Sequence, residues 1–328
     1  MAPRAGGLRI ASRAAHLEEG LFGQVLLWVF ELLPWLESRG LRPEWDVCSL
    51  LYSEPASRPV LPGVFDLAYE PAAARRSLSL LRARVLHTSV LGGDWAGTHA
   101  LWSRFFVVPA RIAAQADAVA LPPGTLGLHY RGTDKNRQSI DTNAVSVDDF
   151  LTLAHAFVAE HPEVAALFVA SDEPGVLERV RERFPALAVH GLGDVPFHKA
   201  DVAAGKADRA LLDCVLLSRC RWLLKCSSAL SGFAKVLNPG LDCHRVSACK
   251  LFGDVPYFPD AYVPRLSLRD PTAAAILARQ FAGDWLDDPA AARWTTPFVS
   301  RPRFGPWQKA LRALKYAVTA AMGRPRKA

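Results

Sequence analysis

In the second half of the chain, short apolar runs alternate with longer stretches of helical spacing. The run 166–170 is continuously apolar, which is typical of strands covered on both faces of a sheet, and the mainly apolar run 125–130 is a further strand candidate. The stretch 147–160 between them has the length of a helix, and Ser146 with Asp149 three residues later forms a variant of the capping box. This alternation predicts an α/β fold with a parallel, doubly wound sheet.

The first third of the chain is less regular and mixes both signals. We predict strands at 8–11 and 45–51, and helices at 21–36 and 72–86, the second helix being rich in Ala, Arg and Leu. The run 21–36 is strongly apolar, but Pro34 interrupts it and it falls short of the roughly 20 apolar residues that a bilayer requires. A buried helix is therefore expected there.

Two changes of composition divide the chain. Near 114–123 an Ala-rich stretch gives way to Leu, Pro and Pro, a sequence typical of a linker. In the tail, apolar residues fall at helical spacing and basic residues gather on another face. We therefore predict domains over 1–118 and 119–300, followed by a basic amphipathic helix over 301–328. This helix either associates with an anionic membrane through 305–328 or docks across the N-terminal domain.

Composition and charge exclude several classes of protein. The chain has 328 residues, 50% of them hydrophobic, which is enough for a sizeable core and two domains. Its net charge of +7 suits an anionic ligand, but the basic residues are dispersed, so no nucleic-acid partner is expected. The six cysteines lack zinc-site spacing, which favours reduced thiols in the cytoplasm. No apolar run follows the first arginines, so neither a secretion signal nor a membrane anchor is predicted.

The strand 125–130 runs into a dense group of charged residues. His129, Arg131, Asp134 and Lys135 stand at or just beyond the carboxyl end of this strand, where open α/β sheets bind ligands. Arginine offers a planar fork of donors that suits a diphosphate, lysine adds a point charge, and the aspartate can orient a cation or take a proton. The alternative is a solvated strand end whose charges pair with one another.

Acidic residues stand out at two further places. Asp172 and Glu173 follow the strand 166–170, where they can face a ligand or cap the next helix. Asp213 is an isolated acid in an otherwise apolar helix, and a buried carboxylate is costly unless something pairs with it. A nucleobase with paired N–H donors would satisfy Asp213; a salt bridge to Arg209 or Lys206 is the alternative.

Three serines mark the next strand end. Ser227 and Ser228 follow the strand 222–224 directly and precede a helix that contains Ser231. Amide groups and the dipole at the start of a helix favour an anion, so a phosphate could bind there without a metal. An ordinary helix cap accounts for one serine, but less readily for all three.

The order His129, Arg131 and Thr133-Asp134-Lys135 resembles a motif of the fucosyltransferase superfamily, which includes α-1,6-fucosyltransferases and protein O-fucosyltransferases. Because the later landmarks recur in the family's order, the resemblance covers roughly 126–263. It implies the GT-B glycosyltransferase architecture, in which two Rossmann-like domains face a cleft. The acceptor side would then be 1–118 and the GDP-sugar donor domain 119–300.

The resemblance also implies roles for individual residues. Arg131 would bind the β-phosphate of GDP-fucose, Asp172 would lie against the donor, and the serine pair would face the β-phosphate. Asp213 would accept hydrogen bonds from the Watson-Crick edge of guanine, with His129 alongside. The predicted donor-binding residues are His129, Arg131, Lys135, Asp172, Asp213, Ser227 and Ser228.

The chain departs from the family's pattern in two places. The loop 20–24 looks like a degraded form of the family's N-terminal Gly-rich loop without its Asn, and a plain helix start explains it equally well. Where core α-1,6-fucosyltransferases place a catalytic Glu, this register has Gln138 or Ser139. We therefore expect Arg131, Asp134 and Asp141 to be catalytic, with Asp134 or Asp141 as the base. Glu18 or Glu19 from the N-terminal domain are alternative bases.

Together with these residues, the resemblance implies an inverting, metal-independent transferase that moves fucose from GDP-fucose to a glycan or lipid-linked glycan. No cofactor or metal is expected. Because eukaryotic members of the family usually carry a membrane anchor, the resemblance points to a bacterial cytoplasmic enzyme. Use of another GDP-hexose, and a nucleotide-sugar-binding protein that has lost the base, are the alternatives.

Overall fold

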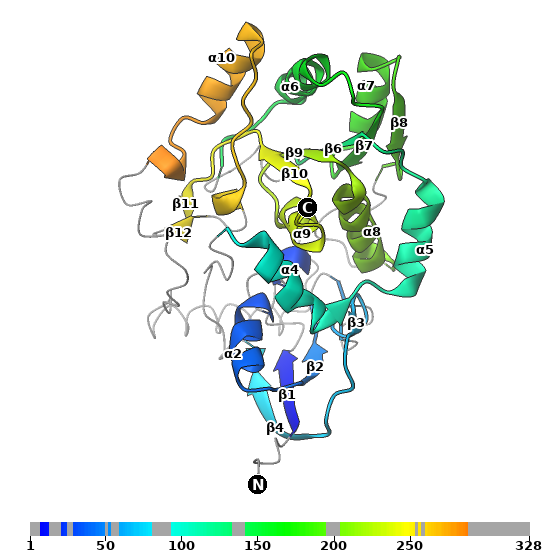
Figure 1. Ribbon diagram of the computed structural model, residues 1–328, viewed down its shortest axis with the longest axis vertical. Helices are drawn as coiled ribbons and strands as arrows, with labels where there is room; N and C mark the ends of the chain where they lie inside the picture. The colour runs from blue at the N-terminus through cyan, green and yellow to red at the C-terminus, as the bar shows by residue number, and fades with distance from the viewer. Residues whose placement is uncertain are drawn as a thin grey trace, which may run out of the picture.

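The computed structural model describes residues 7–12, 21–24, 29–49, 52–53, 59–80, 93–132, 142–194, 204–252, 255–256 and 260–287. These segments form two parallel sheets, one from each half of the chain, with helices around them (Figure 1). The α/β class predicted from the sequence is therefore confirmed, and two parallel α/β units are what a GT-B architecture requires.

The larger sheet has five parallel strands in the order β10-β9-β6-β7-β8. Its strands are β6 (Thr125–Tyr130), β7 (Ala166–Ser171), β8 (Ala188–Gly191), β9 (Trp222–Lys225) and β10 (Asp242–Arg245). The chain builds from β6 outward to β8, then returns to the other side of β6 to add β9 and β10. The order thus reverses between β6 and β9, and open α/β sheets bind ligands beyond the carboxyl ends of the strands at such a point.

Helices cover both faces of this sheet. The connecting helices are α6 (Val147–Glu160), α7 (Val176–Arg183), α8 (Lys206–Arg219) and α9 (Ala229–Leu237). In Figure 1, α6 and α7 lie on one side of the sheet and α8 and α9 on the other. The strands predicted at 125–130 and 166–170 and the helix at 147–160 are confirmed, and the Ser146 hydroxyl accepts a hydrogen bond from the Asp149 amide at 3.1 Å.

Alternation along β6 assigns its side chains to the two faces. Leu126, Leu128 and Tyr130 belong to the hydrophobic cluster that contains α6. Gly127 faces α8 instead, since a Cβ atom there would lie 3.2 Å from both the Leu217 side chain and the Cys220 sulfur. His129, two residues after Gly127, therefore points toward the same side as α8.

The smaller sheet has the order β2-β1-β4, which is typical of a Rossmann-like unit. Its parallel strands are β1 (Gly7–Ser12), β2 (Glu44–Val47) and β4 (Ala74–Ser79). The helix predicted over 72–86 is wrong within the described part, because 74–79 forms β4. Helix propensity is a weak preference, and pairing with β1 supplies the backbone hydrogen bonds that override it.

The described parts of the apolar run 21–36 are helical. The run contains α1 (Leu21–Gln24), the 3-10 turn η3 (Phe30–Leu32) and the start of α2 (Leu33–Ser38), while 25–28 lie outside the described residues. The buried helix predicted there is therefore confirmed in the described residues, with a 3-10 turn directly before α2. Pro34 occupies the first turn of α2, where its missing N–H costs nothing and its fixed φ favours a new helix start.

Buried side chains join the two sheets through α8 and α9. The helix α4 (Trp95–Ser103) packs on α9, and α5 (Ala110–Val119) packs on α8. The rings of Trp102 and Phe233 meet edge to face with centroids 4.8 Å apart. One hydrophobic cluster consequently runs from the first sheet into the second. The domain boundary after residue 118 stays a prediction, as does the basic helix over 301–328, which lies outside the described residues.

Short elements complete the described chain. They are β3 (Asp66–Leu67), β5 (Phe106–Val107), β11 (Leu251–Phe252), β12 (Val255–Pro256), η4 (Asp260–Tyr262), α10 (Pro271–Gln280) and η5 (Trp285–Asp287). The helix α10 packs against α6. Within the segments described, every helix is too short or too polar to cross a bilayer.

Candidate functional site

The ends of β6 and β7 are tied together by Asp172. Its Oδ2 atom accepts from Arg131 Nε at 3.1 Å, and its Oδ1 atom accepts from the Gly132 amide at 3.2 Å. The alternative that Asp172 caps the next helix is wrong, because α7 begins at Val176 with Gly175 in the cap position. Asp172 therefore orients the Arg131 guanidinium at the carboxyl edge of the sheet, where both side chains are partly exposed.

Glu173 lies directly against the same turn. A Cβ atom on Gly132 would overlap the Glu173 carboxylate, so glycine is the residue that permits this close approach. The amide of Glu173 also donates to the Ser171 hydroxyl at 3.0 Å, which fixes the turn after β7. Glu173, the second acidic residue of this turn, is thus held beside the end of β6.

The serines after β9 have different roles. Ser228 is the N-cap of α9, with its hydroxyl accepting from the Leu230 amide at 3.3 Å, and Ser231 donates to the Ser228 carbonyl at 3.4 Å. Helix capping therefore explains Ser228. Ser227 is also buried, but its hydroxyl has no hydrogen-bond partner among the described residues. It is left as a buried polar group at the start of a nine-residue helix.

His129 is a second buried polar group at this edge. Its side chain is 4% exposed, and its Nδ1 atom has no hydrogen-bond partner in the part of the chain that the structure describes. Burial lowers the pKa of His129 well below its usual value, and the nearby charges of Arg131 and Lys225 lower it further. The imidazole is therefore neutral at pH 7, with one ring nitrogen able to donate and the other able to accept.

Asp213 is the third buried polar residue of the candidate site. Arg209 Nε donates to its Oδ2 atom at 3.2 Å, so the predicted alternative, a salt bridge within the domain, is present. Lys206 instead lies 4.7 Å over the ring of Tyr52. The Oδ1 atom of Asp213 is buried without a partner among the residues placed here. Burial raises the pKa of Asp213 to about 6, although Arg209 opposes the shift.

The register between α8 and β6 places Asp213 toward His129. Gly127 on β6 faces Leu217 on α8, and a helix that connects parallel strands runs antiparallel to them. On α8, Asp213 lies one turn before Leu217 and is therefore closer to the carboxyl edge of the sheet. On β6, His129 lies two residues after Gly127, which is a similar distance in the same direction. His129 and Asp213, each with one buried polar atom that has no partner among the described residues, thus lie on the facing surfaces of β6 and α8.

Lys225 is a charged residue that the sequence analysis did not select. It ends β9, is 0% exposed, and forms an ion pair with Asp260, which is also buried. Lysine is almost never fully buried unless it is paired, so a lysine inside the apolar run 222–226 was the signal that could have identified it.

Several predicted residues lie outside the described residues and are therefore not placed. These are Asp134, Lys135, Asp141, Gln138, Ser139, Glu18 and Glu19. The assignments of Asp134 and Asp141 as catalytic residues and of Lys135 as a donor ligand stay predictions. Across the residues that are placed, no group of three or more His, Cys, Asp or Glu side chains is arranged to hold a metal ion.

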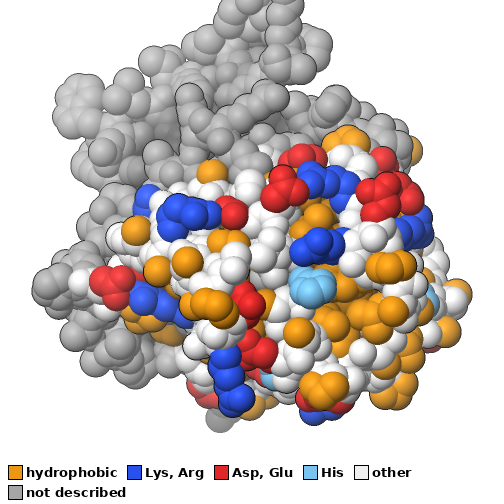
Figure 2. Space-filling view, turned by 90° about the horizontal axis from the view of Figure 1, so that it is seen from above, with side chains coloured by type: hydrophobic (Ala, Val, Ile, Leu, Met, Phe, Trp, Pro, Cys, Tyr) orange, Lys and Arg blue, Asp and Glu red, His pale blue; other side chains and the backbone are white. Residues whose placement is uncertain are grey.

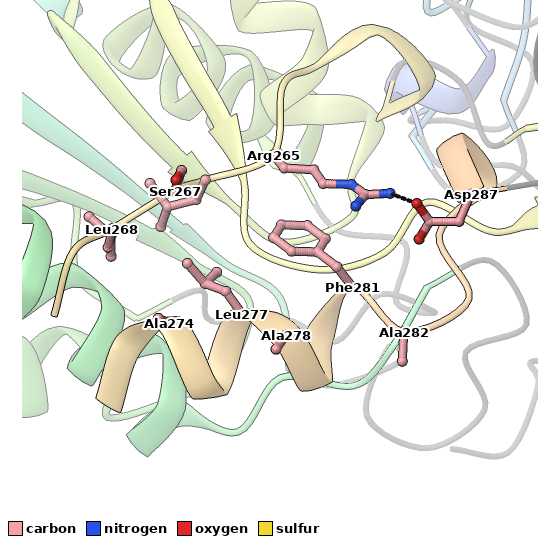
Figure 3. Close-up of a pocket in the computed structure, with 10 residues that line it drawn as sticks. Arg265, Ser267, Leu268, Ala274, Leu277, Ala278, Phe281, Ala282 and Asp287 are labelled. Atoms are coloured by element: carbon pink, nitrogen blue, oxygen red, sulfur yellow. Dashed lines mark hydrogen bonds and ion pairs between the residues drawn. The ribbon is translucent and has the colours of Figure 1, made fainter. Parts of the chain in front are cut away.

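A separate pocket lies between α10 and the segment 265–268 (Figure 3). It has a volume of about 420 Å³ and a lining of mixed polar and apolar surface, with the Arg265 and Asp287 ion pair at one end. None of the candidate donor-binding residues lines this pocket. On the described part of the face drawn in Figure 2, basic side chains lie beside acidic ones, so no single-sign basic surface appears there.

No family model matches the chain, and no curated protein sequence is significantly similar to it. Several solved structures are similar to this chain in fold. An Arabidopsis thaliana FUT1 variant in complex with GDP is 11% identical, with 82% of this chain and 76% of that chain covered and a TM-score of 0.46. POFUT1 in complex with GDP-fucose is 11% identical, with 72% and 95% covered and a TM-score of 0.44.

The fucosyltransferase NodZ from Bradyrhizobium is 16% identical, with 71% of this chain and 93% of that chain covered and a TM-score of 0.44. The chain is thus similar in structure to proteins of the class that its motif resembles.

Proposed function

We propose that this chain binds a GDP-sugar at the carboxyl ends of β6, β7 and β9 and transfers fucose from GDP-fucose, with inversion, to a glycan or lipid-linked glycan. The supporting observation is that three predicted donor-binding residues each carry a buried polar atom without a partner among the described residues: His129 Nδ1, Asp213 Oδ1 and Ser227 Oγ. Each such atom costs about 1–3 kcal/mol when left unsatisfied. A bound ligand with matching donors and acceptors would remove that cost.

The chemistry of these groups matches the parts of a GDP-sugar. Guanine presents an N1–H and an adjacent amino group, two donors that suit the Asp213 carboxylate. The Ser227 hydroxyl and the amides at the start of α9 suit a phosphate, which the helix dipole also favours. Arg131, oriented by Asp172, adds a cation at the neighbouring strand end.

In the proposed reaction an acceptor hydroxyl attacks the anomeric carbon from the side opposite the diphosphate. The bond to the diphosphate breaks as the new glycosidic bond forms, and Asp134 or Asp141 takes the hydroxyl proton. Negative charge develops on the departing GDP, where Arg131, Lys135 and the start of α9 would stabilise it. The residues named above specify the guanine base more closely than the sugar, since none of them is assigned to the methyl group of fucose. Another GDP-hexose, or binding without transfer, is the alternative.

A nucleotide series tests the proposal. A ligand that binds the native state raises its melting temperature by mass action. We expect GDP to raise it more than UDP, CMP or ADP at equal concentration, and GDP-fucose to be hydrolysed slowly without an acceptor. Tight GDP binding with no hydrolysis and no transfer to any of many acceptors would favour the binding protein. Equal shifts with GDP and UDP would contradict the guanine assignment.

Chelation provides a separate test of the metal-independent mechanism. We expect transfer to survive incubation with EDTA, because Arg131, Lys135 and the Ser227–Ser228 turn would supply the positive potential that a divalent ion provides in other transferases. Transfer is measured before and after chelation, with added Mn²⁺ or Mg²⁺ as the control. A loss of activity that either ion restores would show that a metal takes part.

A further inference from the structure

The buried ion pair between Lys225 and Asp260 has no role in the site as proposed so far. Both side chains are inaccessible to solvent, and they join the end of β9 to the turn η4. Removing two charges from water costs several kcal/mol per ion, so such pairs are often no better for stability than apolar residues of similar size. Stability alone is therefore a weak reason for this pair.

The position of Lys225 suggests a different reason. It is in register with His129 on the adjacent strand, and the amide of the next residue, Cys226, donates to the His129 carbonyl at 3.1 Å. Ser227 follows directly. Arg131 lies two residues beyond His129, just after the end of β6, and the charges of Arg131 and Lys225 both act on the buried imidazole. Two cations therefore flank a strand edge at which His129 Nδ1 and Ser227 Oγ are unpartnered among the described groups.

We propose that Lys225 is a positioning residue of the GDP-sugar site, an inference that rests on the proposed function. Asp260 holds the Lys225 ammonium at the end of β9, in register with His129, so the positive member of the ion pair is the one on the strand that leads into the proposed diphosphate site. Burial keeps His129 uncharged, and the charges of Arg131 and Lys225 add to this effect, so that the imidazole can exchange ordinary hydrogen bonds with the ligand. Because Lys225 is buried, it acts through its charge and not by contact with the ligand.

The test replaces both members of the pair, Lys225→Met with Asp260→Asn, so that no unpaired charge is left buried. Binding of GDP, guanosine and inorganic pyrophosphate is measured by calorimetry. We expect GDP and pyrophosphate to bind several-fold more weakly, because the substitutions remove the ion pair that presents its ammonium at the end of β9, although the net charge is unchanged. Guanosine, which carries no phosphate, should bind as it does to the wild type.

The matched control is Lys235→Met in α9, whose ammonium donates to the carbonyls of Pro239 and Leu241 beyond the other end of that helix. It should leave the ratio of GDP to guanosine affinity unchanged. If the first pair of substitutions does not fold, as judged by a lost thermal transition, Lys225→Gln with Asp260→Asn replaces it.

Three results would overturn the inference: an equal loss for GDP and guanosine, which indicates a merely structural role; no change for either ligand; and a wild type that binds no pyrophosphate. The proposed function fails separately. If the wild type binds GDP no better than UDP, but the paired variant still loses pyrophosphate, then the guanine assignment is wrong and the role of Lys225 in anion binding stands.

Discussion

Replacing Arg131 by alanine is expected to weaken GDP binding by about 1.5–3 kcal/mol, the range for a charge-assisted hydrogen bond. The effect on transfer should be larger, a fall in kcat/KM of about 10²–10³-fold, because negative charge grows on the diphosphate as the sugar leaves. Arg131 is the partly exposed cation at the end of β6, and Asp172 fixes its orientation through Nε. Calorimetry with GDP and transfer kinetics with GDP-fucose measure the two effects.

Two variants make this result specific. Arg131→Lys should restore only part of the activity, since an ammonium cannot reproduce the planar fork of a guanidinium. Arg181→Ala, which removes an exposed arginine paired with Glu178 on α7, should behave as the wild type. Near-normal turnover of Arg131→Ala would place the diphosphate elsewhere.

Much of the second sheet was predictable because its signals are local. A continuous apolar run, a cap such as Ser146, and a polar turn at a strand end each reside within about 15 residues. The carboxyl ends of parallel strands meet at one edge, so His129, Asp172 and Ser227 could be grouped without knowledge of the strand order.

What could not be predicted depends on contacts between distant segments. The stretch 74–79 has residues that favour a helix, and only the presence of β1 beside it makes a strand more favourable. The pairing of Arg131 with Asp172 was open for the same reason, because 41 positions along the chain separate them. Likewise the burial of Lys225 as part of an ion pair depends on Asp260, which comes from a turn after the last strand of the sheet. Which charged residues pair depends on the tertiary structure, and their spacing along the sequence does not reveal it.

Asp213→Asn is expected to make the protein more stable near pH 7 while reducing its preference for GDP. The folded-state pKa of Asp213 is about 6, above the usual value of 3.8, so the folded state holds this proton more tightly than the unfolded state. The free energy of unfolding therefore falls as pH rises from about 4 to about 6, by about 3 kcal/mol in total, and stays lowered above that window. Asparagine carries no charge, so the variant should not show this fall. Thermal or denaturant unfolding between pH 4 and 8 measures the difference.

The same substitution should affect nucleotide binding in the opposite direction. A carboxylate accepts from both donors of guanine, whereas the asparagine amide would present one donor of its own to them, a mismatch that costs about 1–3 kcal/mol. GDP affinity should fall to near that of UDP, and UDP affinity should change little. In the wild type, GDP should also bind more weakly below pH 6, as Asp213 takes up its proton and loses an acceptor.

The control for both effects is Asp208→Asn on the same helix. Asp208 is exposed and pairs with Arg111 at 2.6 Å, so its replacement should change neither the pH dependence of stability nor the ratio of GDP to UDP affinity by much. If Asp213→Asn gains stability but keeps the full preference for GDP, then the buried carboxylate is costly without reading the base. That result would remove the main support for a guanine nucleotide, and with it the case for GDP-fucose as the donor.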